Sequence, residues 1–402
     1  MRYRGRFSPD GDDGDLTQTL DLDLGDRSRD PWTFHLSGLG SVDLDGKAGS
    51  GDVFFDLSDT HSSSFHGRLY ELYADAHRSA LATMRVGRMT TYEAPVFLWF
   101  DGALAETEEL TSPRSGGLRL GAYGGQSVHA NESSPEGDLL WGLYAIVTPW
   151  SSGRLRVDWL HAEDETLLGD QDDDLLSLEL WQRVDASLDT YGAYSRLDGA
   201  GRDLRLRGTY ATPGDLLLQI SYHELLTTQR DLTTELDPFF SSLLELFPFR
   251  EAQVLLTKDL GERTTLVVGG DLRRVSDSGD VGRFNRDFER YHATGVRRDV
   301  VASGVSVSVS AEAWSGEDDV RTWGASVDAP LAEHLDFSLG SFFSLYKFDI
   351  GVDDEERQDV RTNYLRLKQG WSERTSIEVS YEFEDNDLAD VHILRLGLSH
   401  RF

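Results

Sequence analysis

The chain of 402 residues contains no cysteine. Zinc–thiolate sites, iron–sulfur clusters, covalent haem attachment, a cysteine nucleophile and disulfide bonds are therefore excluded. Basic residues are also scarce, because 39 lysines and arginines face 71 aspartates and glutamates, for a formal charge of −32. This balance excludes the basic surface that nucleic acid requires. Long apolar runs are missing too, and a run such as residues 96–100 is far too short for a membrane-spanning helix.

Glycine, in contrast, is plentiful, with 39 glycines against 10 prolines. This ratio fits many short strands joined by turns. The mean hydropathy of −0.41 is typical of a soluble protein. Strands that alternate lipid-facing and water-facing residues average to an equally low value, however. The composition therefore leaves two candidates, an acidic soluble β protein and a membrane β-barrel.

The end of the chain favours the barrel. Residues 391–402 alternate with a period of two, which is the signature of a strand. One face carries Leu394, Leu396, Leu398, His400 and Phe402, and the other carries Arg395, Gly397, Ser399 and Arg401. A final strand of this kind that stops on an aromatic residue resembles the closing strand of Gram-negative outer-membrane β-barrels of the porin-like family. The resemblance implies that Phe402 belongs to the signal read by the barrel-assembly machinery; His400 departs from the apolar residue usual at its position.

Similar alternating segments recur along the whole chain. Examples are Thr375/Ile377/Val379/Tyr381/Phe383, Leu335/Phe337/Leu339, Leu216/Leu218/Ile220/Tyr222 and Leu155/Val157/Trp159. We predict an all-β fold, a single transmembrane antiparallel up-and-down barrel over residues 1–402, with about 22 strands and a range of roughly 18 to 24. Residues 2–7 and 52–80 give the weakest strand patterns.

The connections are of two kinds. Tight turns rich in glycine and proline are expected at residues 149–153, 211–215, 259–262 and 369–372. Acidic loops are expected at residues 163–174, 317–319, 349–356 and 384–390. If the short turns face the periplasm, every acidic loop falls on the external rim. The chain opens without an apolar signal core, so we interpret it as the mature form of a bacterial outer-membrane protein.

The expected inward positions of the strands carry many ionised side chains. Those we select as lumen residues are Arg119, Arg154, Arg156, Arg205, Arg207, Glu378 and Glu382. Guanidiniums on one wall facing carboxylates on another would create a transverse field that orients solutes and sets ion preference. The alternative is that each is an ordinary solvated lumen residue.

Residues 84–106 resemble a porin segment in which a loop between two strands dips into the pore. On that resemblance the constriction residues are Arg85, Arg88, Tyr92, Glu93 and Asp101. An external loop with incidental charges is the alternative. A second long connection, residues 227–249, places an apolar stretch between two prolines, and its apolar side chains are Phe239, Phe240, Leu243, Leu244 and Phe247. Such a loop is expected to plug the lumen, dock a partner, or pack on its own barrel.

The predicted function is a passive channel for small hydrophilic or ionic solutes, with an acidic external mouth that concentrates cations and a lumen of mixed charge. The main alternative is a sheath around a partner such as a multihaem cytochrome, whose haems would have to arrive on the partner. A rim enzyme is not expected, because no Gly-x-Ser-x-Gly elbow or paired histidine is present. A soluble β-helix or sandwich is the residual alternative.

We expect no cofactor and no dedicated metal site, although the acidic loops are expected to be bridged loosely by cations to lipopolysaccharide. The expected partners are outer-membrane lipid and lipopolysaccharide, the assembly machinery, small solutes and, in the alternative, a periplasmic or outer-membrane cytochrome. Nucleic acid is not among them.

Overall fold

The computed structural model describes residues 1–46, 54, 63–76, 81–91, 96–112, 116–128, 138–166, 169–227, 247–277, 287–315, 320–344, 360–386 and 390–402. All regular secondary structure in these ranges is β-strand. Among these residues, none forms a helix long and apolar enough to cross a membrane.

The strands have the following bounds: β1 Arg2–Ser8, β2 Gly11–Leu24, β3 Trp32–Asp43, β4 Phe65–Ala76, β5 Leu81–Thr91, β6 Leu98–Thr107, β7 Leu110–Ser112, β8 Gly116–Ser127, β9 Leu139–Trp150, β10 Gly153–Thr166, β11 Gly169–Arg183, β12 Leu188–Leu197, β13 Ala200–Thr212, β14 Leu216–Leu225, β15 Phe249–Asp259, β16 Thr264–Val275, β17 Phe288–Arg298, β18 Ser306–Ser315, β19 Val320–Ala332, β20 Leu335–Ser344, β21 Val360–Ser372, β22 Thr375–Asn386 and β23 Val391–His400.

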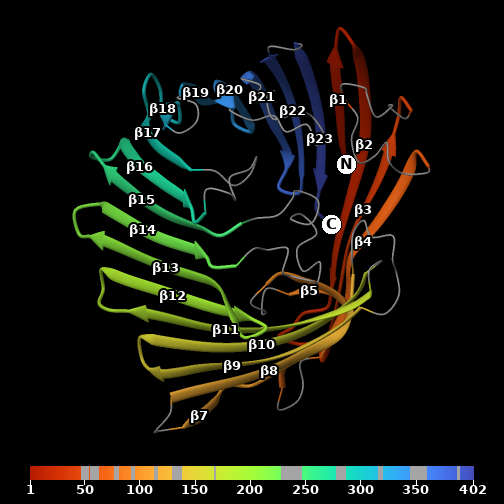
Figure 1. Cartoon of the computed structure of the whole chain (residues 1–402). Helices are drawn as coiled ribbons and strands as arrows, with labels where there is room; N and C mark the ends of the chain where they lie inside the picture. The colour runs from red at the N-terminus through yellow and green to blue at the C-terminus, as the bar shows by residue number, and fades with distance from the viewer. Residues whose placement is uncertain are drawn as a thin grey trace.

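These strands form one closed antiparallel sheet. Each long strand pairs with the long strands before and after it in sequence, and β1 pairs with both β2 and β23. Figure 1 shows the strands following one another around a ring until β23 lies beside β1. The short strand β7 continues β6, since both pair with β8. The barrel therefore has 22 strands, as the sequence predicted, and the weak segment at residues 2–7 is the strand that closes it.

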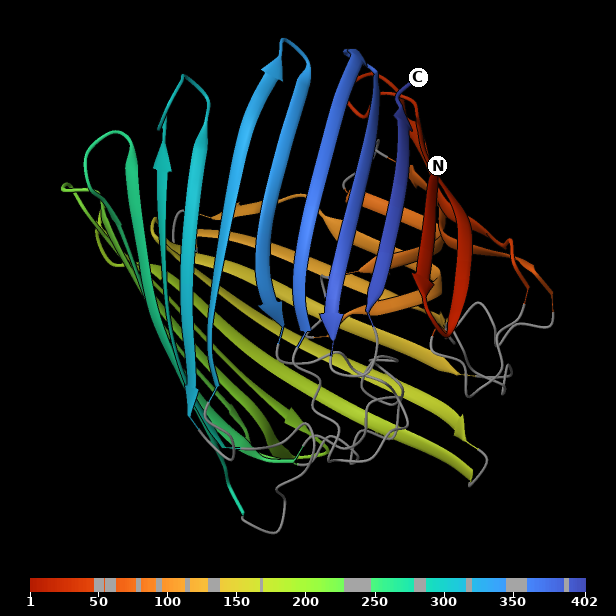
Figure 2. The ribbon, with the colours of Figure 1, turned by 90° about the horizontal axis from the view of Figure 1, so that it is seen from above.

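The connections alternate between two rims because neighbouring strands are antiparallel. All four predicted tight turns lie on one rim, where they join β9 to β10, β13 to β14, β15 to β16 and β21 to β22. Both termini are also on this rim, and the Met1 amino group donates a hydrogen bond to the Leu398 carbonyl over 3.0 Å. We call it the turn rim and the opposite one the loop rim. Figure 2 shows the long strands between them.

One predicted acidic loop is wrong. Within the range 163–174, residues 163–166 and 169–174 are the loop-rim ends of β10 and β11, which stay in register from Glu163 and Asp172 to Thr166 and Gly169. A run of acidic residues was therefore not evidence of a loop. A strand hairpin that projects beyond the lipid has water on its outer face, and carboxylates are tolerated there. Residues 384–386 likewise end β22, whereas 317–319 and 349–356 lie outside the described residues.

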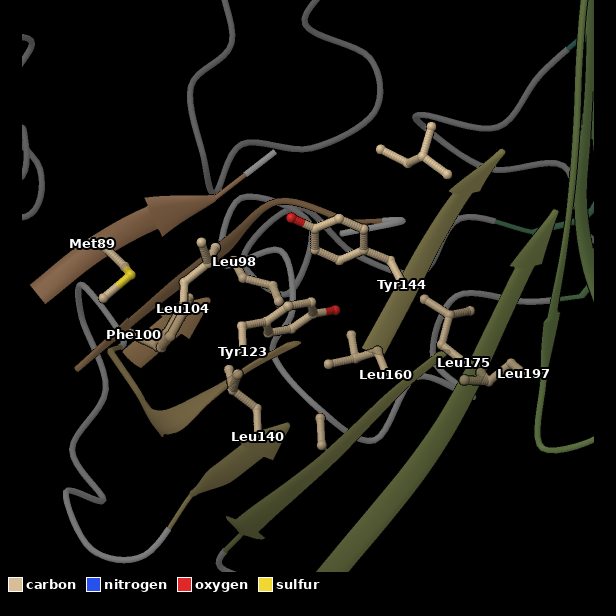
Figure 3. Close-up of a cluster of buried hydrophobic side chains, with 12 residues drawn as sticks. Met89, Leu98, Phe100, Leu104, Tyr123, Leu140, Tyr144, Leu160, Leu175 and Leu197 are labelled. Carbon is tan, nitrogen blue, oxygen red and sulfur yellow. The ribbon is translucent and has the colours of Figure 1, made fainter. Parts of the chain in front are cut away.

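The two faces of the wall differ as the alternation predicted. Outward positions carry exposed apolar side chains, among them Leu178, Ile220, Val268, Leu339 and Leu398. On the inner face of β5 to β12, near the loop rim, buried apolar side chains form a cluster. Its members are Met89, Leu98, Phe100, Leu104, Tyr123, Leu140, Tyr144, Ile146, Leu160, Ala162, Leu175 and Leu197 (Figure 3).

Two tyrosines of this cluster lie over glycines of the neighbouring strand. Tyr144 on β9 is opposite Gly121 on β8, and Tyr123 on β8 is opposite Gly142 on β9. A methyl group added to Gly121 would come within 2.0 Å of the Tyr144 ring, and one added to Gly142 within 2.3 Å of the Tyr123 ring. Only glycine leaves room for each ring, so the two pairs fix how the tyrosines lie on the wall.

Candidate functional site

Strand register assembles the inward ionised side chains into rows that run across the strands. The first row follows consecutive register partners from β8 to β16 and contains Arg119, Ile146, Arg156, Glu179, Ala193, Arg205, His223, Glu251 and Arg273. The second runs one step closer to the turn rim, from β10 to β18, and contains Arg154, Trp181, Tyr191, Arg207, Ser221, Gln253, Asp271, Arg290 and Trp314. We call them the first and second rows.

Five of the predicted lumen arginines belong to these rows: Arg119, Arg154, Arg156, Arg205 and Arg207. The structure thus places them together on one inner wall. Their contact with a solute stays a prediction.

The tightest contacts join the first row to the buried cluster. Arg156 donates to Asp158 from Nε over 2.9 Å and from Nη2 over 2.7 Å, and the two side chains are almost completely buried. The Arg156 guanidinium lies 4.7 Å from the centre of the Tyr144 ring. Burying two charges is costly unless they are paired and hydrogen-bonded, so this geometry is what allows Arg156 and Asp158 to lie inside the wall.

A second contact extends the same network towards β6. The Tyr144 hydroxyl donates to Glu106 Oε2 over 2.8 Å, and Arg119 Nη1 donates to Glu106 Oε1 over 3.3 Å. Arg119 and Arg156 were predicted from the sequence as lumen residues, whereas Glu106 and Tyr144, which connect them, were not. Their alternation with outward residues such as Leu143 was the signal that places them on the inner face.

Other arginines of the two rows are more exposed than Arg156. Arg205 donates to Asp203 over 2.9 Å and its side chain is 54% exposed. Arg290 donates to Glu312 over 2.7 Å and lies 3.5 Å from Asp271. Towards the turn rim, Arg154 lines a cavity of about 670 Å³ together with Trp150, Trp181, Arg183 and Asp189. Polar groups on this part of the wall are therefore accessible from the lumen.

A third row crosses the closing seam of the barrel. It contains Arg366, Ser380, Arg395, Arg4 and Asp15, which are register partners from β21 through β22, β23 and β1 to β2. We call it the seam row.

The two predicted glutamates flank the seam row. Glu382 forms an ion pair with Arg395, and Glu378 lies 3.5 Å from Arg366. Arg4 likewise pairs with Asp15.

The predicted segregation of charge between walls is therefore wrong for the described residues. On both sides of the barrel most of the row arginines are paired with a carboxylate of the same or a neighbouring strand, as Arg156, Arg290 and Arg395 are. Local pairing lowers the energy of each guanidinium more than a carboxylate across the lumen does, since the Coulomb interaction falls with distance. The mixed-charge lumen itself is what the sequence indicated.

The residues predicted to form the constriction lie on both faces of the barrel wall. Arg85 faces inward, where it donates to Asp75 over 2.8 and 3.1 Å and lies 3.8 Å from the Tyr73 ring. Arg88 and Asp101 are register partners on the outer face, opposite to the buried pair of Met89 and Phe100.

Arg88 and Asp101 therefore cannot act in a constriction. Arg85 and Arg88 are separated by an odd number of positions, and a strand with period two cannot place both inside. Tyr92 and Glu93 lie outside the described residues.

The remaining predicted residues are placed as follows. Phe239, Phe240, Leu243 and Leu244 lie outside the described residues, and Phe247 is half-buried just before β15. Phe402 is 93% exposed beyond β23, with its ring 4.9 Å from the His400 ring. In the described ranges no group of three histidine, aspartate or glutamate side chains is close enough to hold a metal ion.

Comparisons with known proteins bear on the fold. No protein-family model matches the chain, and no curated protein does. Two structures of the translocation pore of the P pilus usher, PapC, align with TM-scores of 0.54 and 0.52, at 12% and 11% identity, over 100% of this chain and 99% of each pore chain. A structure of Pseudomonas aeruginosa OpdK with vanillate aligns at 12% identity over 99% of this chain and 95% of that one, with a TM-score of 0.45. The usher likeness and the closed sheet show that the chain has the porin-like fold of outer-membrane β-barrels, as its last strand indicated.

Proposed function

We propose that this protein is a bacterial outer-membrane channel through which small hydrophilic or ionic solutes diffuse, and that it catalyses no reaction. The observation that carries the proposal is the exposure of ionised side chains on the inner face of a closed barrel. Arg205 and Arg366 face inward with side chains 54% and 50% exposed. Charged groups of this kind need water, because a dry lumen would impose a large desolvation cost on them. A water-filled lumen is the physical requirement for diffusion.

The outer face supports the placement in a membrane. Apolar side chains such as Leu178, Val268 and Leu398 are exposed at outward positions of widely separated strands. An exposed apolar surface of this extent is unfavourable in water and favourable in lipid. Since short turns face the periplasm in outer-membrane barrels, the loop rim is the external one.

The loop rim carries an excess of carboxylates, and we expect a preference for cations. The strand ends there include the exposed carboxylates of Asp172 and Asp174 on β11 and the partly exposed Glu163 on β10. Carboxylates at a mouth raise the local concentration of cations and lower that of anions. Lipopolysaccharide, the assembly machinery and the solutes stay predicted partners.

Reconstitution into a planar lipid bilayer tests the proposal. The folded protein should give discrete conductance steps, and heat-unfolded protein at the same concentration should give none. A salt gradient across the bilayer should then give a reversal potential of the sign expected for modest cation selectivity. A folded, inserted protein without conductance steps would contradict the channel, whereas steps with anion selectivity would contradict only the role of the acidic rim.

A further inference from the structure

Two arginines face each other on the outer surface of the barrel. Arg250 on β15 and Arg274 on β16 are register partners. They share the outward face with exposed Val254 and Leu272, because each is separated from these residues by an even number of positions. Like charges directly opposite one another on a sheet have Cβ atoms about 5 Å apart and repel. Such a pair is unfavourable unless an anion lies between or beside the two guanidiniums.

The flanking strands supply part of the compensation, in the same way on both sides. Arg250 Nε donates to Glu224 over 2.8 Å, and the Tyr222 hydroxyl donates to the same carboxylate over 2.8 Å. On the other side Arg274 forms an ion pair with Glu289, which also accepts a hydrogen bond from the Tyr291 hydroxyl over 3.1 Å. These six side chains form an arc across β14, β15, β16 and β17.

The arc leaves hydrogen-bond donors unused at its centre. The Arg250 side chain is 66% exposed, and its two terminal nitrogens donate no hydrogen bond to any described residue. The Arg274 side chain is 43% exposed, and its Nη1 donates to the Arg273 and Phe288 carbonyls over 2.9 and 3.3 Å. The unused terminal nitrogens therefore belong to Arg250. Both carboxylates lie on the outer strands of the arc, so neither lies between the two guanidiniums.

The position of the arc on the strands indicates which anion meets it. Towards the turn rim the next outward positions are apolar, and they carry Ala252, Val254 and Leu256 on β15 and Leu272, Gly270 and Val268 on β16. Towards the loop rim the strands end within two residues, at Phe249 and Val275. The arginines therefore lie where the lipid-facing band stops, which is the level of the headgroups.

We propose that Arg250 and Arg274 together bind the phosphate group of a membrane lipid whose acyl chains lie along this apolar band. A phosphate monoester offers three oxygens and nearly two negative charges, which suits two guanidiniums better than a carboxylate does. The apolar surface directly below the pair distinguishes a lipid from free phosphate. On the loop rim of an outer-membrane barrel the lipid would be lipid A. The inference rests on the membrane placement proposed above but not on conductance.

Native mass spectrometry of the detergent-solubilised barrel tests the site with two probes, bisphosphorylated lipid A and the same lipid A after removal of both phosphates. The parent protein should bind the phosphorylated form more tightly. In the double variant R250Q/R274Q this preference should fall by about tenfold, since charge-assisted hydrogen bonds to both arginines are lost. The variant R88Q is the matched control, because Arg88 lies on the same outer face near the same rim but faces Asp101. It should keep the preference.

A second variant covers the case in which R250Q/R274Q does not fold. In E224Q/E289Q both arginines remain and the competing carboxylates are neutralised, so binding of phosphorylated lipid A should become stronger. Weaker or unchanged binding there would overturn the site, and so would an unchanged preference in folded R250Q/R274Q.

Competition with inorganic phosphate separates the two sources of the anion. Displacement of lipid A by low millimolar inorganic phosphate would show a free-phosphate site and contradict the lipid. Planar-bilayer conductance should be unchanged in both double variants, because the arc faces away from the lumen. Failure of the lipid site can therefore be distinguished from failure of the channel.

Discussion

The inner faces of two parts of the barrel differ sharply although their outer faces are alike. From β5 to β13 the inner face carries buried side chains on every long strand, among them Phe100, Tyr144, Asp158 and Leu175. From β16 to β20 no described side chain is buried, and the inner face of β18 to β20 presents mainly serine and glycine, including Ser308, Ser326 and Gly340. We call these the packed wall and the open wall.

The difference shows that contact with lipid determines the side chains on the outer face of each strand. The side chains on the inner face vary independently with the environment in the lumen. Both walls expose apolar side chains outward, such as Leu178 on the packed wall and Val309 on the open wall. Inside, the packed wall excludes water and holds its charges in pairs, whereas small polar residues leave the open wall wet. We therefore expect stability to depend on the packed wall and solute passage to follow the open wall.

The largest expected effect is the loss of Asp158. The variant D158A leaves the Arg156 guanidinium buried without its main ion-pair partner, and such a change costs about 3–5 kcal/mol. Urea unfolding of the barrel in detergent micelles, followed by tryptophan fluorescence, measures it. The matched variant on the open wall is D328A, which removes an exposed carboxylate that accepts a hydrogen bond from Ser338 over 2.6 Å; it should cost no more than about 1 kcal/mol. Equal losses in the two variants would remove the distinction between the walls.

The same bulky replacement should act differently on the two walls. Ala162 is 1% exposed, so A162W overpacks the cluster and should destabilise the barrel by about 1–3 kcal/mol or more. Ser308 faces the lumen and contacts Ser326 at 2.8 Å between the hydroxyl oxygens, so S308W should change stability by less than about 1 kcal/mol. In a planar bilayer S308W should instead reduce the single-channel conductance. A normal conductance would show that solutes do not pass along the open wall.

A single methyl group tests the tyrosine and glycine pairs of the packed wall. In G121A the new methyl group meets the Tyr144 ring, displaces it and weakens its hydrogen bond to Glu106, at a cost of about 1–3 kcal/mol. At Gly208 a Cβ would meet no atom within 4 Å, so G208A serves as the control and should be neutral. The same urea unfolding assay compares them. Neutral behaviour of G121A would mean that the Tyr144 ring moves freely.

The smallest expected effect concerns the exposed pair of the seam row. Glu378 and Arg366 lie 3.5 Å apart with side chains 45% and 50% exposed, so E378Q should change the free energy of unfolding by less than about 1 kcal/mol. Because the side chain faces the lumen, the variant should still shift the reversal potential slightly towards anions. A clear loss of stability would instead place this pair among the structural ones.

Much of the barrel could be predicted from the sequence, because apolar and polar residues alternate with a period of two wherever one face of a strand contacts lipid. The last strand, the four tight turns and the strand number were all predicted on that basis. The inward orientation of Arg119, Arg156 and Arg205 followed as well, since each lies between outward leucines or valines. The prediction was wrong for residues 163–174, where a hairpin continues beyond the lipid and composition no longer reports on strand or loop.

The errors at the site have a different cause. Arg88 and Asp101 were selected from a resemblance, although their position relative to Met84 and Val86 already placed Arg88 outside. Arg250 and Arg274 lie opposite each other only in the register that β15 and β16 adopt. That register depends on the length of the turn at residues 260–263, which alternation alone does not give. Contacts such as Tyr144 with Glu106 join strands that are far apart in sequence, and alternation alone gives no register between them.

Because β1 pairs with β23, the first strand to be synthesised finds its second partner only in the last. Met1 contacts Leu398, so one edge of β1 stays uncovered until almost the whole chain has been made. Contacts between residues so distant in sequence form late and slowly, and an unpaired strand edge recruits other strands. A sheet that had not yet closed would keep two free edges, and either edge could pair with a strand of another chain. Pairing of β23 with β1 therefore protects the chain from association as well as completing the wall.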